Sequence, residues 1–258
     1  MELGVSFSTK YADELGIEWQ DAYTALLDVG IDKFRLMSYW DIHEPKKDKY
    51  VFDTLDQQMD IAEDYGAKVT LALGQRQPRW PECHIPSWVK NRHQQLLEYL
   101  EVVVKRYRNH PALESFQLEN EAANRLFGHC PEFNRDELKR EFNLVKSLTD
   151  LPVHINASNQ SGIPLREPVG DRVGFSIYKR AHFLALGKQW PWNFWYVPWW
   201  WHSFRAALTE EFSQTETFIH ELQAEPWGPE ITKLLSSEEQ AKTMNADIFV
   251  TIDADGQH

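Results

Sequence analysis

Residues 68–118 hold the pattern that decides the fold. They read Lys68-Val-Thr-Leu-Ala-Leu73, then an amphipathic stretch over about 87–108, then Leu113-Glu-Ser-Phe-Gln-Leu118. Two short apolar runs that flank a helical pattern predict a β–α–β unit with parallel strands.

The same alternation continues in both directions along the chain. Further strands are expected at 3–8, 33–38, 152–156, 173–178, 217–221 and 247–252, and further helices at about 22–27, 54–65, 135–148, 201–212 and 237–245. Strands alternating with helices over 258 residues are typical of a (β/α)8 TIM barrel. The alternative is an open doubly wound sheet, which the lack of a Gly-rich phosphate loop after the first strand disfavours. We predict one α/β barrel domain over residues 1–258, incomplete at the eighth strand and helix.

Charge and composition exclude several classes of function. The chain has 27 Lys and Arg against 39 Asp and Glu, for a net charge of −12. A nucleic-acid binder needs a basic stripe, and so does a surface that is recruited to anionic lipid. The 11 Trp residues predict either stacking on sugar rings or a large aromatic core. Six of them lie in 190–201, which prolines interrupt; this segment is expected to be a subsite wall, a lid, or an apolar patch for a partner or a membrane.

Polar residues follow several of the predicted strands, and in a barrel the active site lies at that end. Glu121 follows the fourth strand and Glu221 ends the seventh, so the two carboxyls are expected on opposite sides of one opening. Cleavage of a glycosidic bond needs such a pair, one to protonate the leaving oxygen and one to attack or to activate water.

These residues resemble a known pattern. Gln117-Leu-Glu-Asn-Glu-Ala122 and Phe218-Ile-His-Glu221 resemble the ends of the fourth and seventh strands of clan A glycoside hydrolases. Phe34-Arg-Leu-Met-Ser-Tyr-Trp40 resembles the clan's second strand, and Tyr178 its residue at the end of the sixth. The resemblance covers about residues 3–246 and points to cellulase-like and β-galactosidase-like members.

The resemblance implies a retaining mechanism with two glutamates. Glu221 would be the nucleophile and Glu121 the general acid/base, with their carboxyls about 5–5.5 Å apart. Asn120 would bind the sugar 2-hydroxyl, Arg35 would lie under the nucleophile, and Tyr178 would donate a hydrogen bond to it. An oligosaccharide or a glycoside is the implied substrate.

Several of these positions keep an alternative. Glu225 lies four residues beyond Glu221 and is the nucleophile if the strand runs longer. Glu119 shares a side with Glu121 in a regular strand and competes with it. Arg35 can instead make a structural salt bridge. Trp40, Trp80 and Trp227 follow the second, third and seventh strands and are either sugar platforms or packing residues. Asn156 is a polar candidate at the end of the fifth strand.

The two cysteines leave the cellular compartment open. Cys83 and Cys130 follow adjacent strands, so they form either a disulfide over the site, which indicates an oxidising compartment, or two free thiols. The chain begins without the pattern of a signal peptide, which favours the cytoplasm. The spacing of Cys and His matches no metal site, and we expect no metal and no cofactor.

The end of the chain departs from the clan pattern. Residues 250–258 resemble the strand and Asp-x-Asp of family-2-type glycosyltransferases, with Asp253 and Asp255 as the acidic pair. A glycosyltransferase is therefore one rival function. The other is a non-catalytic barrel that binds carbohydrate. The sequence predicts a retaining β-glycosidase ahead of both, and it leaves the sugar, the linkage and the oligomeric state open.

Overall fold

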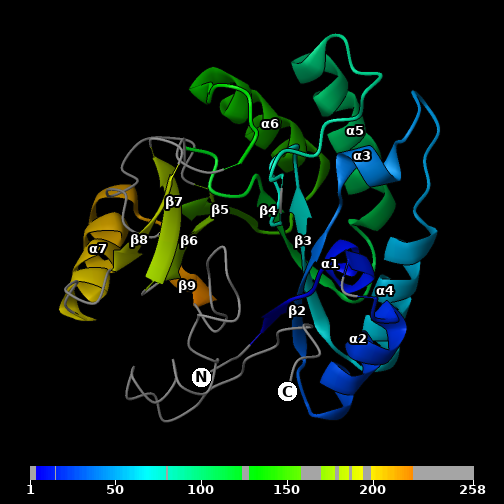
Figure 1. The fold of residues 1–258 in the computed structure, drawn as a ribbon, viewed down its shortest axis with the longest axis horizontal. Helices are drawn as coiled ribbons and strands as arrows, with labels where there is room; N and C mark the ends of the chain where they lie inside the picture. Colours follow the sequence, from blue (N-terminus) through cyan, green and yellow to red (C-terminus); the bar gives the residue numbers. More distant parts are fainter. Residues whose placement is uncertain are drawn as a thin grey trace.

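The computed structural model describes residues 4–14, 16–79, 81–123, 128–157, 170–177, 180–185, 188–193 and 199–222. Its main sheet contains β1 (Val5–Ser6), β2 (Lys33–Met37), β3 (Lys68–Leu73), β4 (Leu113–Leu118), β5 (Val153–Ala157), β6 (Arg172–Ile177) and β9 (Glu216–Leu222). These strands pair in that order and all run parallel. The sheet curls into an incomplete barrel, as Figure 1 shows. The predicted α/β barrel class is confirmed, and the expected eighth strand lies outside the described residues.

Helices follow most strands and cover the outside of the curved sheet (Figure 1). They are α1 (Thr9–Glu14), α2 (Trp19–Asp28), α3 (Trp40–His43), α4 (Asp53–Asp64), α5 (Arg92–Tyr107), α6 (Arg135–Leu148) and α7 (Trp199–Ser213). Helix α5 begins five residues later than the pattern predicted. The side-chain oxygen of Gln95 accepts hydrogen bonds from the backbone of Lys90 and Asn91, which fixes the chain just before the first turn.

The core lies between the sheet and these helices. Strand β3 alternates little and is buried over most of its length, as expected for a parallel strand covered on both faces. Leu71, Leu100 and Phe116 are fully buried there. The helix-periodic apolar positions of α5 supply the facing layer, with Leu96, Tyr99, Leu100, Val103, Val104 and Tyr107 buried.

The chain after β6 forms an element that the sequence did not predict. Strands β7 (Arg180–Ala185) and β8 (Lys188–Asn193) pair antiparallel in a separate two-stranded sheet. The expected strand–helix alternation is therefore interrupted by a hairpin before α7. Within the described part of the chain, none of the helices has the length and apolar content that a bilayer crossing needs.

Candidate active site

Arg35 joins the two sides of the incomplete barrel. It lies in β2 with a buried side chain, and its Nη1 donates to Oε1 of Glu221 in β9 at 2.5 Å. Its Nη2 donates to Oδ1 of Asn120, just after β4, at 2.8 Å. One guanidinium therefore holds an amide from the fourth strand and a carboxyl from the seventh in the described sheet. For Arg35 the sequence left two alternatives, a place under the predicted nucleophile Glu221 or a structural salt bridge, and the structure pairs it with Glu221.

Two neighbouring strands complete the surroundings of the Glu221 carboxyl. Asn156 in β5 donates from Nδ2 to Oε1 at 3.4 Å, and Ser176 in β6 donates from Oγ to Oε2 at 3.2 Å. Each donor favours the charged form of a carboxyl that it contacts. Both carboxylate oxygens of Glu221 therefore accept hydrogen bonds, one of them from Asn156, which the sequence named as a candidate at the end of the fifth strand.

An irregularity in β9 turns Glu221 inward. The pairing of β6 with β9 shifts between Phe175 and Ser176, so that Phe175 faces Ile219 and Ser176 faces Glu221. A regular strand would place Glu221 on the same side as Ile219, which is 59% exposed. The extra residue is a bulge of the kind found at barrel rims and beside active sites. It brings Glu221 to the side of Arg35.

The Asn120 amide has a fixed orientation. Its Oδ1 accepts from Arg35 at 2.8 Å, from Asn156 Nδ2 at 3.1 Å and from Gln117 Nε2 at 3.4 Å. These partners are all donors, so the oxygen must face them and the NH2 group must face away. The NH2 group donates to Oε2 of Glu82 at 3.4 Å. Asn120 is thus ordered by contacts on both ends of its amide.

Glu82 is a buried carboxyl that the sequence analysis did not select. It lies in the loop between β3 and α5, is 5% exposed, and has a left-handed backbone with φ of 72°. Its pKa is raised to about 7: burial is the main cause, the charges of Glu221 and Glu121 act in the same direction, and Arg76 and the Asn120 hydrogen bond act against it. The sequence feature that could have identified Glu82 is its position next to Cys83, in the loop after the third strand, at the end of the barrel where active sites lie.

Glu119, the alternative to Glu121, has both carboxylate oxygens in contacts with the backbone. Its two carboxylate oxygens accept from the backbone N–H groups of Gln75 and Arg76 at 2.9 and 2.7 Å. Gly74 leaves room for that carboxylate, since a Cβ there would lie 2.3 Å from Glu119 Oε1. Burial and the nearby Glu141 raise the pKa of Glu119 well above its usual range. The hydrogen bonds of Glu119 therefore connect the end of β4 to the chain just after β3.

Glu121 lies one residue beyond Asn120 and is partly exposed. Both Glu119 and Glu121 have left-handed backbones, with φ of 51° and 45°. The strand has therefore ended, and the rule that places alternate residues on one side does not apply to this pair. Glu121 lies near enough to Glu82 for its charge to act on that carboxyl.

Trp40 belongs to the core. Its ring is fully buried and packs against Tyr99 at a centroid distance of 5.8 Å and against Trp88 at 6.2 Å. Its Nε1 donates to Oε2 of Glu44 at 2.8 Å. Of the two roles considered for Trp40, these contacts support packing over a sugar platform. The other aromatic and acidic candidates lie outside the described residues: Trp80, Tyr178, Glu225 and Trp227.

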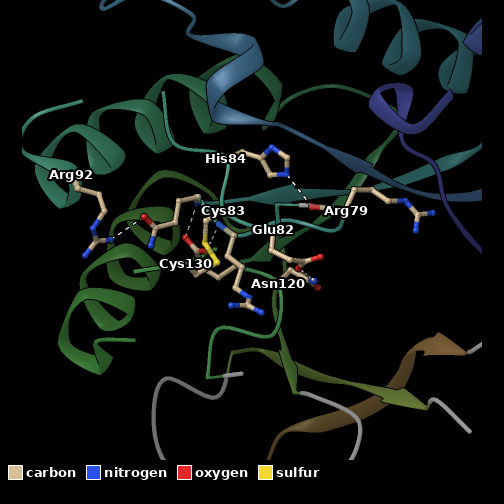
Figure 2. The surroundings of a disulfide bond; sticks show 10 residues. Arg79, Glu82, Cys83, His84, Arg92, Asn120 and Cys130 are labelled. Carbon is tan, nitrogen blue, oxygen red and sulfur yellow. Dashed lines mark hydrogen bonds between the residues drawn. A yellow bond between two sulfur atoms is a disulfide. The ribbon is translucent and has the colours of Figure 1, made fainter. Parts of the chain in front are cut away.

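A disulfide joins Cys83 and Cys130, 47 residues apart in the sequence, so of the two alternatives for these cysteines the structure contains the bridge. Figure 2 shows it between the loops that follow β3 and β4, with Glu82 and Asn120 close by. The backbone N–H of His129 also donates to the carbonyl of Pro81 at 2.9 Å. The loop that carries Glu82 is thus tied to the loop after β4.

Two further features lie outside this network. A cavity of about 300 Å³ opens beside the disulfide, and its lining includes Glu119 and Glu141 but neither Arg35 nor Glu221. Among the described residues, Asp60, Glu63 and His110 bring possible metal ligands within 4.8 Å of one another. They lie near the amino ends of the strands, where His110 is within 3.4 Å of Asp60, and the two carboxyl residues are exposed.

Comparison with known proteins agrees with the resemblance drawn from the motifs. Residues 14–101 match the model of glycoside hydrolase family 42, described as beta-galactosidase. The resemblance to clan A glycoside hydrolases is confirmed. The matched segment contains Arg35 and Glu82 but ends before Asn120, Glu121 and Glu221. No curated protein matches the chain.

Solved structures of glycoside hydrolases share the fold. An endo-beta-1,4-xylanase of family 10 from Gloeophyllum trabeum has a TM-score of 0.60 and 15% identity, over 93% of this chain and 76% of that chain. The beta-galactosidase from Marinomonas ef1 has a TM-score of 0.56 and 14% identity, over 89% and 50%. The beta-galactosidase from Halorubrum lacusprofundi has a TM-score of 0.51 and 17% identity, over 69% of this chain and 40% of that chain. The chain thus spans 40–50% of the length of these two β-galactosidases.

Proposed function

We propose that this protein is a retaining glycosidase that cleaves a β-glycosidic bond, with Glu221 as nucleophile and Glu121 as general acid/base. The observation that carries the proposal is the set of donors around Glu221, from Arg35, Asn156 and Ser176 on three different strands. Donors to both oxygens keep a carboxylate ionised and oriented, as a nucleophile requires. The relationship to glycoside hydrolases supports carbohydrate as the substrate class.

The proposed mechanism has two steps. An oxygen of Glu221 attacks the anomeric carbon while the bond to the leaving oxygen breaks and Glu121 gives that oxygen a proton. Glu121 then takes a proton from water, whose oxygen attacks the same carbon and releases the Glu221 carboxylate. The second N–H of the Asn120 amide is available for the sugar 2-hydroxyl, because the first donates to Glu82.

Four residues keep their predicted roles within this proposal. Tyr178 would donate a hydrogen bond to the nucleophile, and Trp80 and Trp227 would stack on sugar rings. Glu225 is the alternative nucleophile, and the fixed contacts of Glu221 support Glu221 over it. A covalent trap separates the two, because a 2-deoxy-2-fluoro aryl glycoside labels the peptide that contains the nucleophile.

The test of the proposal uses a panel of aryl β-glycosides of different sugars. We expect turnover of at least one sugar, and Glu221→Ala to lower kcat by about 10⁴-fold or more. Azide should restore activity to Glu221→Ala with an α-glycosyl azide as product, and to Glu121→Ala with a β-glycosyl azide. Glu225→Gln is the matched control and should retain the activity.

Two results would count against the proposal. Sugar binding without turnover in the unmodified chain would favour a non-catalytic carbohydrate-binding barrel. Loss of activity in Glu225→Gln, with Glu221→Ala still active, would reassign the nucleophile.

The disulfide supports an oxidising compartment as the location. Alkylation of the protein as extracted from cells, with and without reduction, tests this placement. A bridge that resists alkylation until it is reduced agrees with the placement, and two freely alkylated cysteines contradict it.

A further inference from the structure

His220 is the extra residue of the bulge in β9. Phe175 of β6 pairs with Ile219 and Ser176 pairs with Glu221, so the pairing of the two strands passes over His220. A bulge leaves its extra residue without a partner in the neighbouring strand. A contact outside the β6–β9 pairing is therefore needed to hold His220, and with it the bulge, in one conformation.

The His220 side chain reaches across the curved sheet to β4. Its Nε2 lies 2.8 Å from Oε1 of Gln117, whose side chain is fully buried. Strands β5 and β6 lie between β4 and β9 in the sheet, so this contact crosses the concave face. Gly174 of β6 leaves room for the ring, since a Cβ there would lie 2.5 Å from His220 Cβ.

The other hydrogen bonds of Gln117 decide which atom donates in this contact. Nε2 of Gln117 donates to the backbone carbonyl of Glu119 at 3.2 Å and to Oδ1 of Asn120 at 3.4 Å. A carbonyl can only accept, so the amide oxygen of Gln117 faces His220, and Nε2 of His220 is the donor. Burial is the main cause that lowers the pKa of His220 well below its usual range. His220 is therefore a neutral imidazole with its proton on Nε2.

These contacts close a ring of side chains around the proposed site. His220 donates to Gln117, which donates to Asn120. Asn120 also accepts from Arg35, and Arg35 donates to Glu221. Because Glu221 follows His220 in the chain, the ring begins and ends on β9. It connects the strand of the proposed nucleophile to the strand that leads to the proposed acid/base.

We propose that His220 is a positioning residue of the proposed glycosidase: through its hydrogen bond to Gln117 it anchors the bulge that turns Glu221 toward Arg35. The proposal rests on the proposed function and adds to the Arg35 contacts a second connection between β4 and β9. His220 acts through the backbone of Glu221 and takes no part in either step of the reaction.

Two substitutions separate the hydrogen bond from the space that the ring fills. His220→Gln keeps an N–H donor near the position of Nε2, whereas His220→Leu fills a similar space without a donor. Thr217→Val is the matched control, because it removes a side-chain hydrogen bond of the same strand, to Glu210 of α7, outside the ring of contacts. The measurements are kcat and KM on an aryl β-glycoside, with circular dichroism to check the fold.

We expect His220→Leu to lower kcat by about 10²-fold with KM within about threefold, because a misplacement of about 1 Å at a reacting group costs that much. His220→Gln should stay within about fivefold of the unmodified kcat, and Thr217→Val within about twofold. A folded His220→Leu whose kcat falls by less than about threefold would overturn the proposal. An equal loss in His220→Gln and His220→Leu would do so too, because the donor would then not be what matters.

A double substitution tests whether the effect passes through Gln117. Gln117→Met removes the acceptor of the His220 hydrogen bond. In that background His220→Leu should lower kcat by less than about threefold further, because the contact that it breaks is already absent. A further loss of about 10²-fold would mean that His220 acts independently of Gln117, against the proposal.

A measurement without turnover separates this proposal from the proposed function. In protein labelled with ¹⁵N in the histidine rings, the signals that are absent from His220→Gln should show a neutral ring with its proton on Nε2 from about pH 5 to about pH 8. A proton on Nδ1, or titration near the ordinary value of about 6.5, would contradict the proposal. If no glycoside is cleaved, the proposed function fails, and these spectra still decide whether His220 donates to Gln117.

Discussion

The two sides of the sheet that meet at the site are built differently. On the β1–β4 side, helices bury the strands in one continuous core that contains Leu71 and Phe116. On the β9 side, Ile219 and Leu222 are each 59% exposed, and Phe212 of α7 is 68% exposed. Burial of apolar surface is the main stabilising contribution in folding. The first side is therefore held by packing, whereas Glu221 on the second side is held by polar contacts, of which the one with Arg35 crosses to the first side.

Removing Arg35 is expected to have the largest effect, because Arg35 connects the two sides. Arg35→Leu removes one donor to Glu221 and one donor to Asn120, and it takes the guanidinium charge away from the Glu221 carboxylate. We expect kcat to fall about 10³-fold and the acid limb of the pH profile to move to higher pH, because a neighbouring cation favours an ionised nucleophile. Steady-state kinetics over pH 4–8 on an aryl β-glycoside test both effects.

Arg172→Leu is the control for that experiment. It breaks an exposed pair with Glu216 between β6 and β9, on the same side as Glu221. Exposed ion pairs contribute little, so activity should stay within about twofold. A loss below tenfold in Arg35→Leu, or an equal loss in both variants, would show that Arg35 does not hold the site together.

The sequence predicted the packed side well. The boundaries of β3 and β4 were predicted to the residue, because their apolar runs are followed by Gly74 and Glu119 and each run comes after a helical pattern. The convergence of Arg35, Asn120 and Glu221 followed from the rule that parallel strands end at one edge of a barrel. A resemblance carried by four strand ends was enough to indicate the fold and the relationship to glycoside hydrolases.

The features that the sequence missed depend on tertiary geometry. The bulge that turns Glu221 inward is a pairing irregularity between β6 and β9, and nothing in Thr217-Phe-Ile-His-Glu221 alone marks it. Ser176 was not selected because its role exists only after that shift. Glu82 was missed because its inward direction comes from a left-handed backbone and a disulfide. For Trp40 the sequence left a sugar platform and packing as alternatives, and the contacts with Tyr99 and Trp88 place its ring in the core.

A pair of truncations measures the difference in packing between the two sides. Leu71→Ala removes a fully buried side chain from the β1–β4 side, and Ile219→Ala removes a largely exposed one from β9. We expect the first to lower the free energy of unfolding by about 2–5 kcal/mol and the second by less than about 1 kcal/mol. Urea unfolding followed by circular dichroism gives both values. Equal losses would mean that β9 is packed as firmly as β3.

The smallest expected effect concerns stability rather than catalysis, and it lies where the two sides meet. The pKa of Glu82 is raised by burial to about 7 in the folded chain, whereas an unfolded glutamate titrates near 4.3. Folding therefore favours the protonated carboxyl, and this contribution to stability is lost as the pH rises from the unfolded to the folded pKa. Glu82→Gln stays neutral at every pH and avoids that loss.

The Tm of Glu82→Gln relative to the unmodified protein should therefore be higher by a few degrees at pH 8, with a smaller difference at pH 5. Scanning calorimetry at the two pH values measures the change, and Glu114→Gln gives the background for removing a carboxylate elsewhere in the barrel. A Tm difference that is the same at pH 5 and pH 8 would mean that Glu82 is already ionised at pH 5. The surroundings of Glu82, between Asn120, Gly128 and the disulfide, would then not raise its pKa. The contrast between the packed β1–β4 side and the polar contacts of the β9 side would not extend to this residue.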